Sequence, residues 1–391
     1  MKNAVSRLPA LQGLLAGVLA LLAAAAFVAG CGGGVGSGGT GGFASGPING
    51  FGSVIVGGVR FEDSTAEVED LDGTRRSRDD LRLGMTVDID STAISGSAAT
   101  ASRIRFESEL SGLVGLVDRA GGSFTLLGQR VTVDDSTVFD ERIDGGLAGL
   151  ASGQPVEVYA VFDTAAQRYR ATRVEPAALA LGLRLRGPVA ELNTAAQTLR
   201  VGSTSYSYTG ASGVPAGLVV GQFVRLRLEA ELLPMPRWVV RSFGTALRPW
   251  ADADGVKLEG LITAYTSAAA FSVNGRVVDA SGARPGSGLA AGVRVEVEGS
   301  LRNGVLRATR VVIKSDDEVR DRGFELDGLI TAVNGGVVSF VLRGVTVNTG
   351  RADLRYEDGT AALLTVGRRV EVRGLLSADR RSVDATRIRF R

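Results

Sequence analysis

The sequence predicts an all-β protein in which one small β-rich unit is repeated five times. Three observations support this prediction: a short strand motif recurs at a nearly constant interval, companion motifs lie at matching offsets from it, and apolar residues alternate with other residues between the motifs. A long, nearly constant interval is typical of tandem copies of one small domain, because solenoid repeats are usually shorter.

The recurring motif is Gly-x-x-Val-x-Val, with Ile or Leu in the last position of two copies. The interval is 69 residues from Gly84 to Gly153 and 75 residues from Gly292 to Gly367. Four copies are followed by Ala-Ser-Arg or Ala-Thr-Arg and then Ile or Val, whereas the third has Trp238-Val-Val-Arg241 there. The motif copies start at Gly84, Gly153, Gly221, Gly292 and Gly367.

A glycine followed by an apolar pair opens each unit, and a second predicted strand begins shortly after it. Alternation of apolar and other residues, interrupted by glycine, is typical of half-buried strands joined by tight turns. Phe124, Phe271 and Phe340 share one position of the unit, so we expect them to fill its core. The predicted repeats are repeat 1 (46–108), repeat 2 (109–176), the divergent repeat 3 (182–245), repeat 4 (255–315) and repeat 5 (323–391).

Each repeat is therefore expected to contain five short antiparallel strands. We favour closure of these strands into a small barrel, because closure removes exposed strand edges. An open meander whose neighbours pair edge to edge is the alternative. A variable polar loop precedes each Gly-x-x-Val-x-Val strand and explains why the interval drifts.

The tract from Gly46 to Phe61 resembles the opening of a family of uncharacterised β-domains, named only as a domain of unknown function. Members of that family occur as tandem copies in lipoproteins of Gram-negative bacteria. The resemblance extends from Gly46 to Phe390 and is weakest in repeat 3. It implies OB-like small barrels and a cell-envelope setting, but no catalytic residue.

The N-terminus has the order of a secretory signal: basic residues at Lys2 and Arg7, an apolar stretch from Leu11 to Ala29, and small residues before a cleavage point. Val28, Ala29, Gly30 and Cys31 resemble the lipobox of bacterial lipoproteins, with Val28 where the family prefers Leu. We therefore expect residues 1–30 to be a lipoprotein signal peptide. An ordinary secreted protein and an uncleaved transmembrane anchor are the alternatives.

The resemblance to the lipobox implies that Cys31, the only cysteine of the chain, becomes the acylated first residue. More than one acyl chain is needed for lasting membrane attachment, and a diacyl or triacyl cysteine meets that need. The glycine-rich residues that follow predict a flexible tether over 31–45. Gly32 stands where an Asp would commonly retain such a lipoprotein at the inner membrane, so we expect the outer membrane.

Composition excludes several kinds of chemistry. The chain has no histidine, which removes Ser-His-Asp triads, Cys-His pairs and His-based zinc sites. No cofactor and no metal are predicted. The carboxylate pairs Asp79–Asp80 and Asp134–Asp135 offer a glycosidase hypothesis, but neighbours on a strand point to opposite faces, so solvated loops are the preferred interpretation. With a formal net charge of +2 and no long basic stripe, nucleic acid is not an expected partner.

Four aromatic residues are the candidate binding residues. Tyr206 and Tyr208 alternate in one strand, so both rings lie on one sheet face, and in an OB-like barrel that region can stack on an oligosaccharide or on single-stranded nucleic acid. Packing of the two rings into the core is the favoured alternative. Trp238 and Trp250 lie at or near the boundary after repeat 3, where they either pack units together or offer a binding ring.

Three functions remain open on this basis. The favoured one is a non-enzymatic, membrane-anchored envelope lipoprotein whose tandem domains bind a protein or polysaccharide partner. A structural spacer without a specific ligand is the alternative. A glycoside hydrolase based on carboxylates is ranked last, and it requires two carboxylates converging in a cleft.

Overall fold

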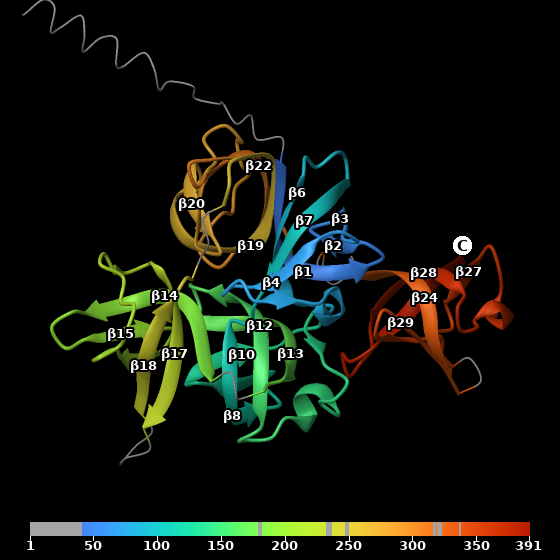
Figure 1. The fold of residues 1–391 in the computed structure, drawn as a ribbon, viewed down its shortest axis with the longest axis horizontal. Helices are drawn as coiled ribbons and strands as arrows, with labels where there is room; N and C mark the ends of the chain where they lie inside the picture. The colour runs from blue at the N-terminus through green and yellow to red at the C-terminus, as the bar shows by residue number, and fades with distance from the viewer. Residues whose placement is uncertain are drawn as a thin grey trace, which may run out of the picture. The chain divides into compact units, whose positions relative to one another are not determined.

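The computed structural model describes residues 41–178, 182–231, 237–246, 250–315, 318, 323–335 and 338–391 (Figure 1). These residues belong to one compact unit. The predicted signal peptide, its lipobox and Cys31 lie outside the described residues, as does the tether up to residue 40. Residues 41–45 of the predicted tether belong instead to the first strand, because their backbone pairs with two other strands.

The described chain is all-β, as predicted, and its strands form small five-stranded barrels. Repeat 2 illustrates the pattern. Its first strand pairs with the second, the second with the third, the third with the last, the last with the fourth, and the fourth with the first. This order is that of an OB-like barrel. The strands and the short 3-10 helix of repeat 2 are β8 (Leu110–Asp118), β9 (Ser123–Leu126), β10 (Gln129–Thr132), β11 (Val138–Phe139), η2 (Gly146–Gly149), β12 (Pro155–Asp163) and β13 (Arg168–Pro176).

One pairing differs from the antiparallel arrangement expected from the sequence. The third and last strands, β10 and β13, run parallel. Alternating directions cannot continue around a closed ring with an odd number of strands, so at least one neighbouring pair must be parallel. Closure of five strands therefore explains this correction.

Repeat 1 has the same cycle of pairings and two additional short strands. Its elements are β1 (Gly41–Phe51), β2 (Val54–Val56), β3 (Val59–Glu62), β4 (Glu67–Asp70), β5 (Arg75–Arg76), η1 (Arg78–Asp80), β6 (Thr86–Thr92) and β7 (Ala98–Phe106). Repeat 3 pairs in the same order. Its strands are β14 (Leu183–Asn193), β15 (Thr198–Val201), β16 (Thr204–Ser207), β17 (Phe223–Glu231) and β18 (Arg237–Gly244).

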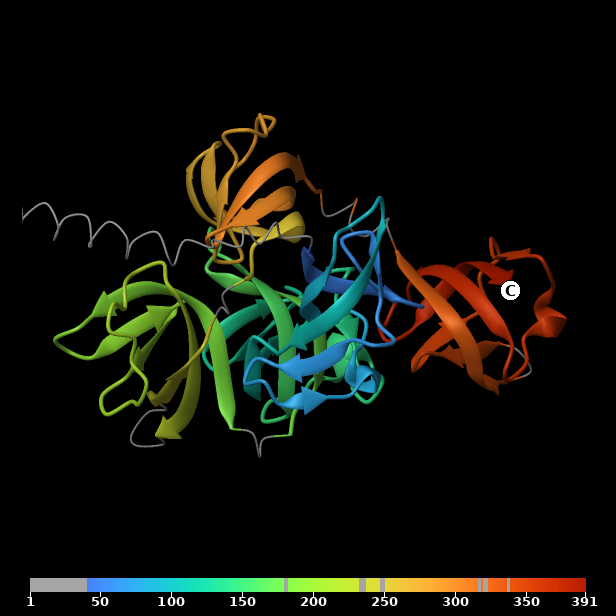
Figure 2. The same cartoon turned by 45° about the horizontal axis from the view of Figure 1, so that its top comes forward.

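Repeats 4 and 5 follow the same order, and Figure 2 shows the red strands of repeat 5 curling around a common interior. Repeat 4 consists of β19 (Ala253–Ser267), β20 (Ala270–Val273), β21 (Arg276–Asp279), β22 (Arg294–Arg302) and β23 (Val305–Ile313). Repeat 5 consists of β24 (Phe324–Asn334), β25 (Ser339–Leu342), β26 (Val345–Asn348), β27 (Arg355–Glu357), η4 (Ala361–Leu363), β28 (Arg369–Leu376) and β29 (Val383–Phe390).

The glycine of each Gly-x-x-Val-x-Val motif has a structural reason. Its φ lies between 80° and 86° in all five copies, a region that other residues enter only at a cost. From this conformation its N–H donates to a carbonyl on the first strand of the same repeat, at 2.7–2.9 Å. The five acceptors are Ile48, Val114, Val189, Ile262 and Ile330. The motif therefore fixes how the fourth strand joins the first.

The hydrophobic interior extends beyond single repeats. Phe124, Phe271 and Phe340 are buried, as predicted from their shared position. One cluster joins apolar residues of repeats 1 and 5, and a second joins those of repeats 2 and 3. Strand pairing also crosses between repeats, because β1 pairs in parallel with β19 and with β24, and β8 pairs with β14.

Candidate functional site

The two tyrosines proposed for ligand stacking are part of the core. Tyr206 is fully buried, and its hydroxyl accepts a hydrogen bond from Gln129 Nε2 at 2.7 Å and donates one to the Leu127 carbonyl at 2.8 Å. Burial raises the pKa of its phenol. Tyr208 is also buried and meets Phe243 edge to face, with ring centroids 6.0 Å apart. Both rings therefore join repeats or fill interiors and present no face to a ligand.

The two tryptophans also pack against neighbouring residues. Trp238 packs against the shared cluster of repeats 2 and 3. Trp250 is buried, with its ring centroid 3.8 Å from that of Phe43, and the Arg276 guanidinium lies 4.0 Å from its ring. Burial lowers the pKa of Arg276 to about 10. Trp250 thus packs repeat 4 onto β1. Of the two roles considered for this tryptophan, packing units together and offering a binding ring, its position fits the first.

The adjacent carboxylate pairs stabilise turns. Asp80 accepts a hydrogen bond from the Ser77 backbone at 2.9 Å and completes the cap of η1. Asp134 accepts hydrogen bonds from the backbone and hydroxyl of Ser136. Burial alone would raise the pKa of Asp134, but these hydrogen bonds and the charge of Arg170 outweigh it and lower the pKa. Neither pair forms a converging acid and base.

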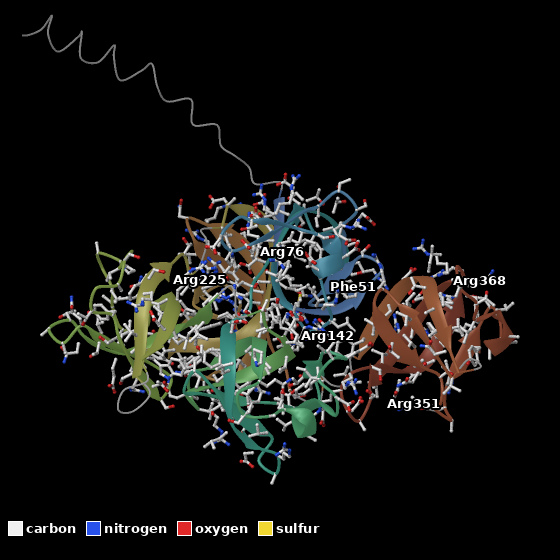
Figure 3. All side chains as sticks on the ribbon, turned by 60° about the horizontal axis from the view of Figure 1, so that its bottom comes forward. Phe51, Arg76, Arg142, Arg225, Arg351 and Arg368 are labelled. Carbon is white, nitrogen blue, oxygen red and sulfur yellow. The ribbon has the colours of Figure 1, made fainter. Side chains whose placement is uncertain are left out.

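A charged cleft of about 390 Å³ lies among repeats 1, 2 and 3, and Arg76 and Arg142, labelled in Figure 3, are among its lining residues. Glu157 and Glu175 also line it and lie directly opposite each other in the β12–β13 pair. Burial raises the pKa of Glu157, and the charge of Glu175 contributes in the same direction.

The charges of this cleft are largely matched by one another. Glu157 accepts hydrogen bonds from Arg184 at 3.2 Å and from Ser108 at 3.0 Å. Nearby, the buried Arg225, also labelled in Figure 3, donates to Glu107 at 2.6 Å and to Asp72 at 2.6 Å. Ion pairs of this kind join repeats 1, 2 and 3. The preferred interpretation of the cleft is therefore an interface between repeats.

A second cavity, of about 240 Å³, has hydrogen-bonding groups without partners. It is lined by residues of repeats 1, 2, 4 and 5, and we call it the polar cavity. Thr172 of β13 and Asn49 of β1 face it, and within the described part of the chain neither Thr172 Oγ1 nor Asn49 Oδ1 has a hydrogen-bond partner, although both atoms are buried. The Thr172 residue is 6% exposed. Buried polar groups are nearly always paired, so these two atoms need a ligand or water.

Comparison of the repeats shows that Thr172 is exceptional. The Ala-Ser-Arg and Ala-Thr-Arg motifs place a hydroxyl at the same point of the last strand. In the other three repeats that hydroxyl donates to a carbonyl of the adjacent strand: Ser102 to Asp90, Thr309 to Glu298 and Thr386 to Arg373, at 3.1–3.2 Å. Thr172 is the copy whose hydroxyl faces the polar cavity instead. The sequence displays the motif but gives no sign of this difference.

Charged residues complete the polar cavity. Arg294 and Arg380 line it together with Asp135, and Arg380 donates to Asp135 at 3.2 Å. The Asp135 side chain is largely solvent-exposed, so it lies where the cavity meets solvent. Pro47, Phe324 and two leucines add apolar surface. Sequence reasoning missed this site because its residues come from four repeats.

The described residues contain no cluster of His, Cys, Asp and Glu that could hold a metal ion. Among the same residues, none forms a helix with the length and hydropathy needed to cross a bilayer.

Comparison with known proteins identifies the repeated domain but no function. No curated protein matches the chain. A Drosophila structure described as "Unr CSD456" is 15% identical, covers 54% of this chain and 98% of its own, and has a TM-score of 0.15. A multidomain protein with nucleic acid binding domains from Streptococcus pneumoniae TIGR4 is 8% identical, covers 52% of this chain and 72% of its own, and has a TM-score of 0.13.

The family comparison agrees with the repeats read from the sequence. Residues 112–175, 259–312 and 327–389, which lie in repeats 2, 4 and 5, match one domain family. The matches do not include repeat 1, where the resemblance was first noted, or the divergent repeat 3. The domain of unknown function DUF5666 is found three times along the chain, at these three stretches.

Proposed function

We propose that this chain is a membrane-anchored lipoprotein of the cell envelope, held by an acylated Cys31, that binds an acidic polysaccharide without transforming it. The observation that supports binding is the pair of buried, unmatched polar atoms in the polar cavity, Thr172 Oγ1 and Asn49 Oδ1. A buried polar group without a partner costs about 1–3 kcal/mol. A ligand that supplies the missing hydrogen bonds recovers that cost.

The chemistry of the lining favours a sugar acid. Sugar hydroxyls donate and accept, which suits the Asn49 carbonyl oxygen and the Thr172 hydroxyl. Arg294 and Arg380 line the cavity, paired with Glu259 at 3.9 Å and with Asp135 at 3.2 Å, and Arg can bind a further carboxylate through paired hydrogen bonds. The apolar surface of Pro47 and Phe324 suits the C–H face of a sugar ring. A uronic acid residue within a polysaccharide combines these three properties.

Calorimetric titration of residues 39–391, which form one compact unit, tests the binding proposal. The probes are a galacturonate oligosaccharide and a neutral glucose oligosaccharide of equal length. We expect the acidic probe to bind and the neutral probe not to bind. We expect Thr172→Val to weaken binding of the acidic probe at least ten-fold. Thr309→Val is the matched control, because it removes the equivalent hydroxyl at a position that does not line the polar cavity. Absence of binding by wild-type protein, or unchanged binding by Thr172→Val, contradicts the proposal.

The anchor is tested separately. Cys31→Ser removes the acceptor for the acyl chains, so we expect the variant to move from the detergent phase to the aqueous phase in a detergent partition of whole cells. Retention of the variant in the detergent phase at unchanged mass contradicts lipidation. The outcome does not depend on whether the polar cavity binds a ligand.

One observation favours a glycoside hydrolase as the second candidate. Glu157 and Glu175 lie opposite each other in the charged cleft, and the pKa of Glu157 is raised, as suits a general acid. Their ion pairs with arginines argue for a structural role. Release of reducing sugar by the wild type and its loss in Glu157→Gln would favour catalysis over simple binding. A purely structural spacer predicts neither binding nor hydrolysis.

A further inference from the structure

Each barrel has an end formed around the glycine of its Gly-x-x-Val-x-Val motif, and we call this surface the glycine end. It contains the motif glycine, the residue before that glycine, and the first-strand residue that precedes the carbonyl acceptor. In repeat 5 these residues are Gly367, Val366 and Leu329. The same hydrogen bond between glycine and first strand defines the glycine end in every repeat, so the five surfaces can be compared position by position.

Repeat 2 covers the glycine end of repeat 1. A Cβ placed on Gly84 would overlap the backbone carbonyl oxygen of Thr172 and would lie 3.0 Å from Val138 Cγ2. Arg173 also donates to the carbonyl of Leu83 at 3.3 Å. Leu83, the residue before the motif glycine, is only 2% exposed.

Repeat 2 also covers the glycine end of repeat 4, through the turn between β12 and β13. A Cβ on Gly292 would lie 2.8 Å from Asp163 Oδ1 and 3.0 Å from Ala165 Cβ. The Thr164 hydroxyl donates to the Ile262 carbonyl, the acceptor of the motif glycine, at 3.3 Å. The turn between the fourth and last strands of one barrel is therefore a partner for the glycine end of another.

The remaining glycine ends are open. Apart from the two chain neighbours of each glycine, no atom of the described residues lies within 4 Å of a Cβ built on Gly153, Gly221 or Gly367. In repeat 5 this end is also apolar, because Leu329 is 56% exposed and Val366 is 64% exposed. A groove of about 680 Å³ adjoins it and includes Leu329 in its lining. Apolar side chains grouped beside a groove are typical of a protein-binding surface.

We propose that the open glycine end of repeat 5 docks onto a second copy of this chain, at the β22–β23 turn of its repeat 4. Continuity with the covered ends supports this occupant, because the turn between the fourth and last strands of repeat 2 already fills the glycine end of repeat 4 within one chain, and the β22–β23 turn joins the same two strands of its own repeat. Asn303 and Gly304 form the tip of the shorter, two-residue β22–β23 turn, and both are exposed. The contact joins unlike surfaces, so it is head to tail.

Two variants of residues 39–391 each block one of the paired surfaces. Val366→Asp places a charge on the glycine end, and insertion of two glycines after Asn303 enlarges the turn at an exposed position that tolerates insertion. By sedimentation equilibrium we expect the wild type to self-associate and each variant to raise the dissociation constant at least ten-fold. Leu116→Asp, which changes a side chain that is 80% exposed elsewhere, should associate as the wild type does.

Mixing the two blocked variants gives the decisive measurement. Each retains one intact surface, so the mixture should form a one-to-one dimer although neither variant associates alone. A mixture that stays monomeric, a wild type that stays monomeric, or a Val366→Asp variant that associates normally overturns the proposal. Unfolding midpoints equal to that of the wild type confirm that the variants fold. These results are independent of saccharide binding in the polar cavity.

Discussion

Substituting alanine for the motif glycine in three repeats separates the cost of backbone conformation from the cost of contact between repeats. Gly84, Gly292 and Gly367 have φ values of 80°, 82° and 85°, so a side chain meets the same backbone strain at each. That strain is about 1–2 kcal/mol, and the lower entropy of an unfolded chain with alanine returns about 0.4–1 kcal/mol of it. The three sites differ only in what covers them.

The structure orders the three losses of stability. Gly367→Ala adds a methyl group to open space, so its cost should be about 1 kcal/mol. Gly292→Ala meets side-chain atoms of Asp163 and Ala165 rather than backbone, so its cost should be slightly larger. Gly84→Ala meets the backbone of Thr172, which must shift, and overpacking of this kind adds about 1–3 kcal/mol.

Amide hydrogen exchange in β6, β22 and β28 measures the opening free energy of each repeat without assuming that the chain unfolds in one step. We expect protection in β6 of Gly84→Ala to fall most and protection in β28 of Gly367→Ala to fall least. Equal losses at the three sites would refute the conclusion that repeat 2 covers the glycine ends of repeats 1 and 4.

Three further predictions concern buried polar contacts. Arg225→Met leaves Glu107 buried without its main partner, so we expect about 3–5 kcal/mol loss of unfolding free energy in urea. Tyr206→Phe leaves the Leu127 carbonyl without its donor, and thermal unfolding should report a loss of about 1–3 kcal/mol. Asp134 has a lowered pKa when folded, so its contribution to stability is present above the unfolded pKa and is lost as pH falls through the folded pKa. Asp134→Asn should therefore destabilise the protein at pH 7, and the difference in midpoint should vanish in acid.

The strand content follows from the sequence because it depends on short-range patterns, whereas barrel closure is favoured over an open meander only by the general argument that closure removes exposed strand edges. The positive φ at the first position of each Gly-x-x-Val-x-Val motif favours glycine. The sequence shows this preference, because the glycine recurs in all five copies although the residues beside it change. The shared position of Phe124, Phe271 and Phe340 likewise predicts burial, because a large apolar residue on a half-buried strand lies on the face that packs into the core.

The aromatic candidates and the polar cavity depend on contacts between repeats, and the sequence gives little access to these. Tyr206 is held by Gln129 and Leu127 of a different repeat, so alternation along its own strand cannot distinguish a binding face from a buried one. The hydroxyl of Thr172 differs from that of Thr309 only through its surroundings. Residues from four repeats line the polar cavity, and no spacing within one repeat records their meeting.

The residue before the motif glycine is large and apolar in some repeats and small or polar in others. The fold of a single repeat does not explain this difference. Leu83 is buried in the cluster of repeats 1 and 5, which also contains Val138 of repeat 2, whereas Val220 and Val366 remain exposed in the equivalent place. Ser152 and Ala291 show that the position accepts small or polar residues. A large apolar side chain there is consequently not required for folding of the repeat, and in repeat 1 it is explained by the contact that covers it. Val366 has no such cover among the described residues, and the mixing of blocked variants tests whether a second copy supplies it.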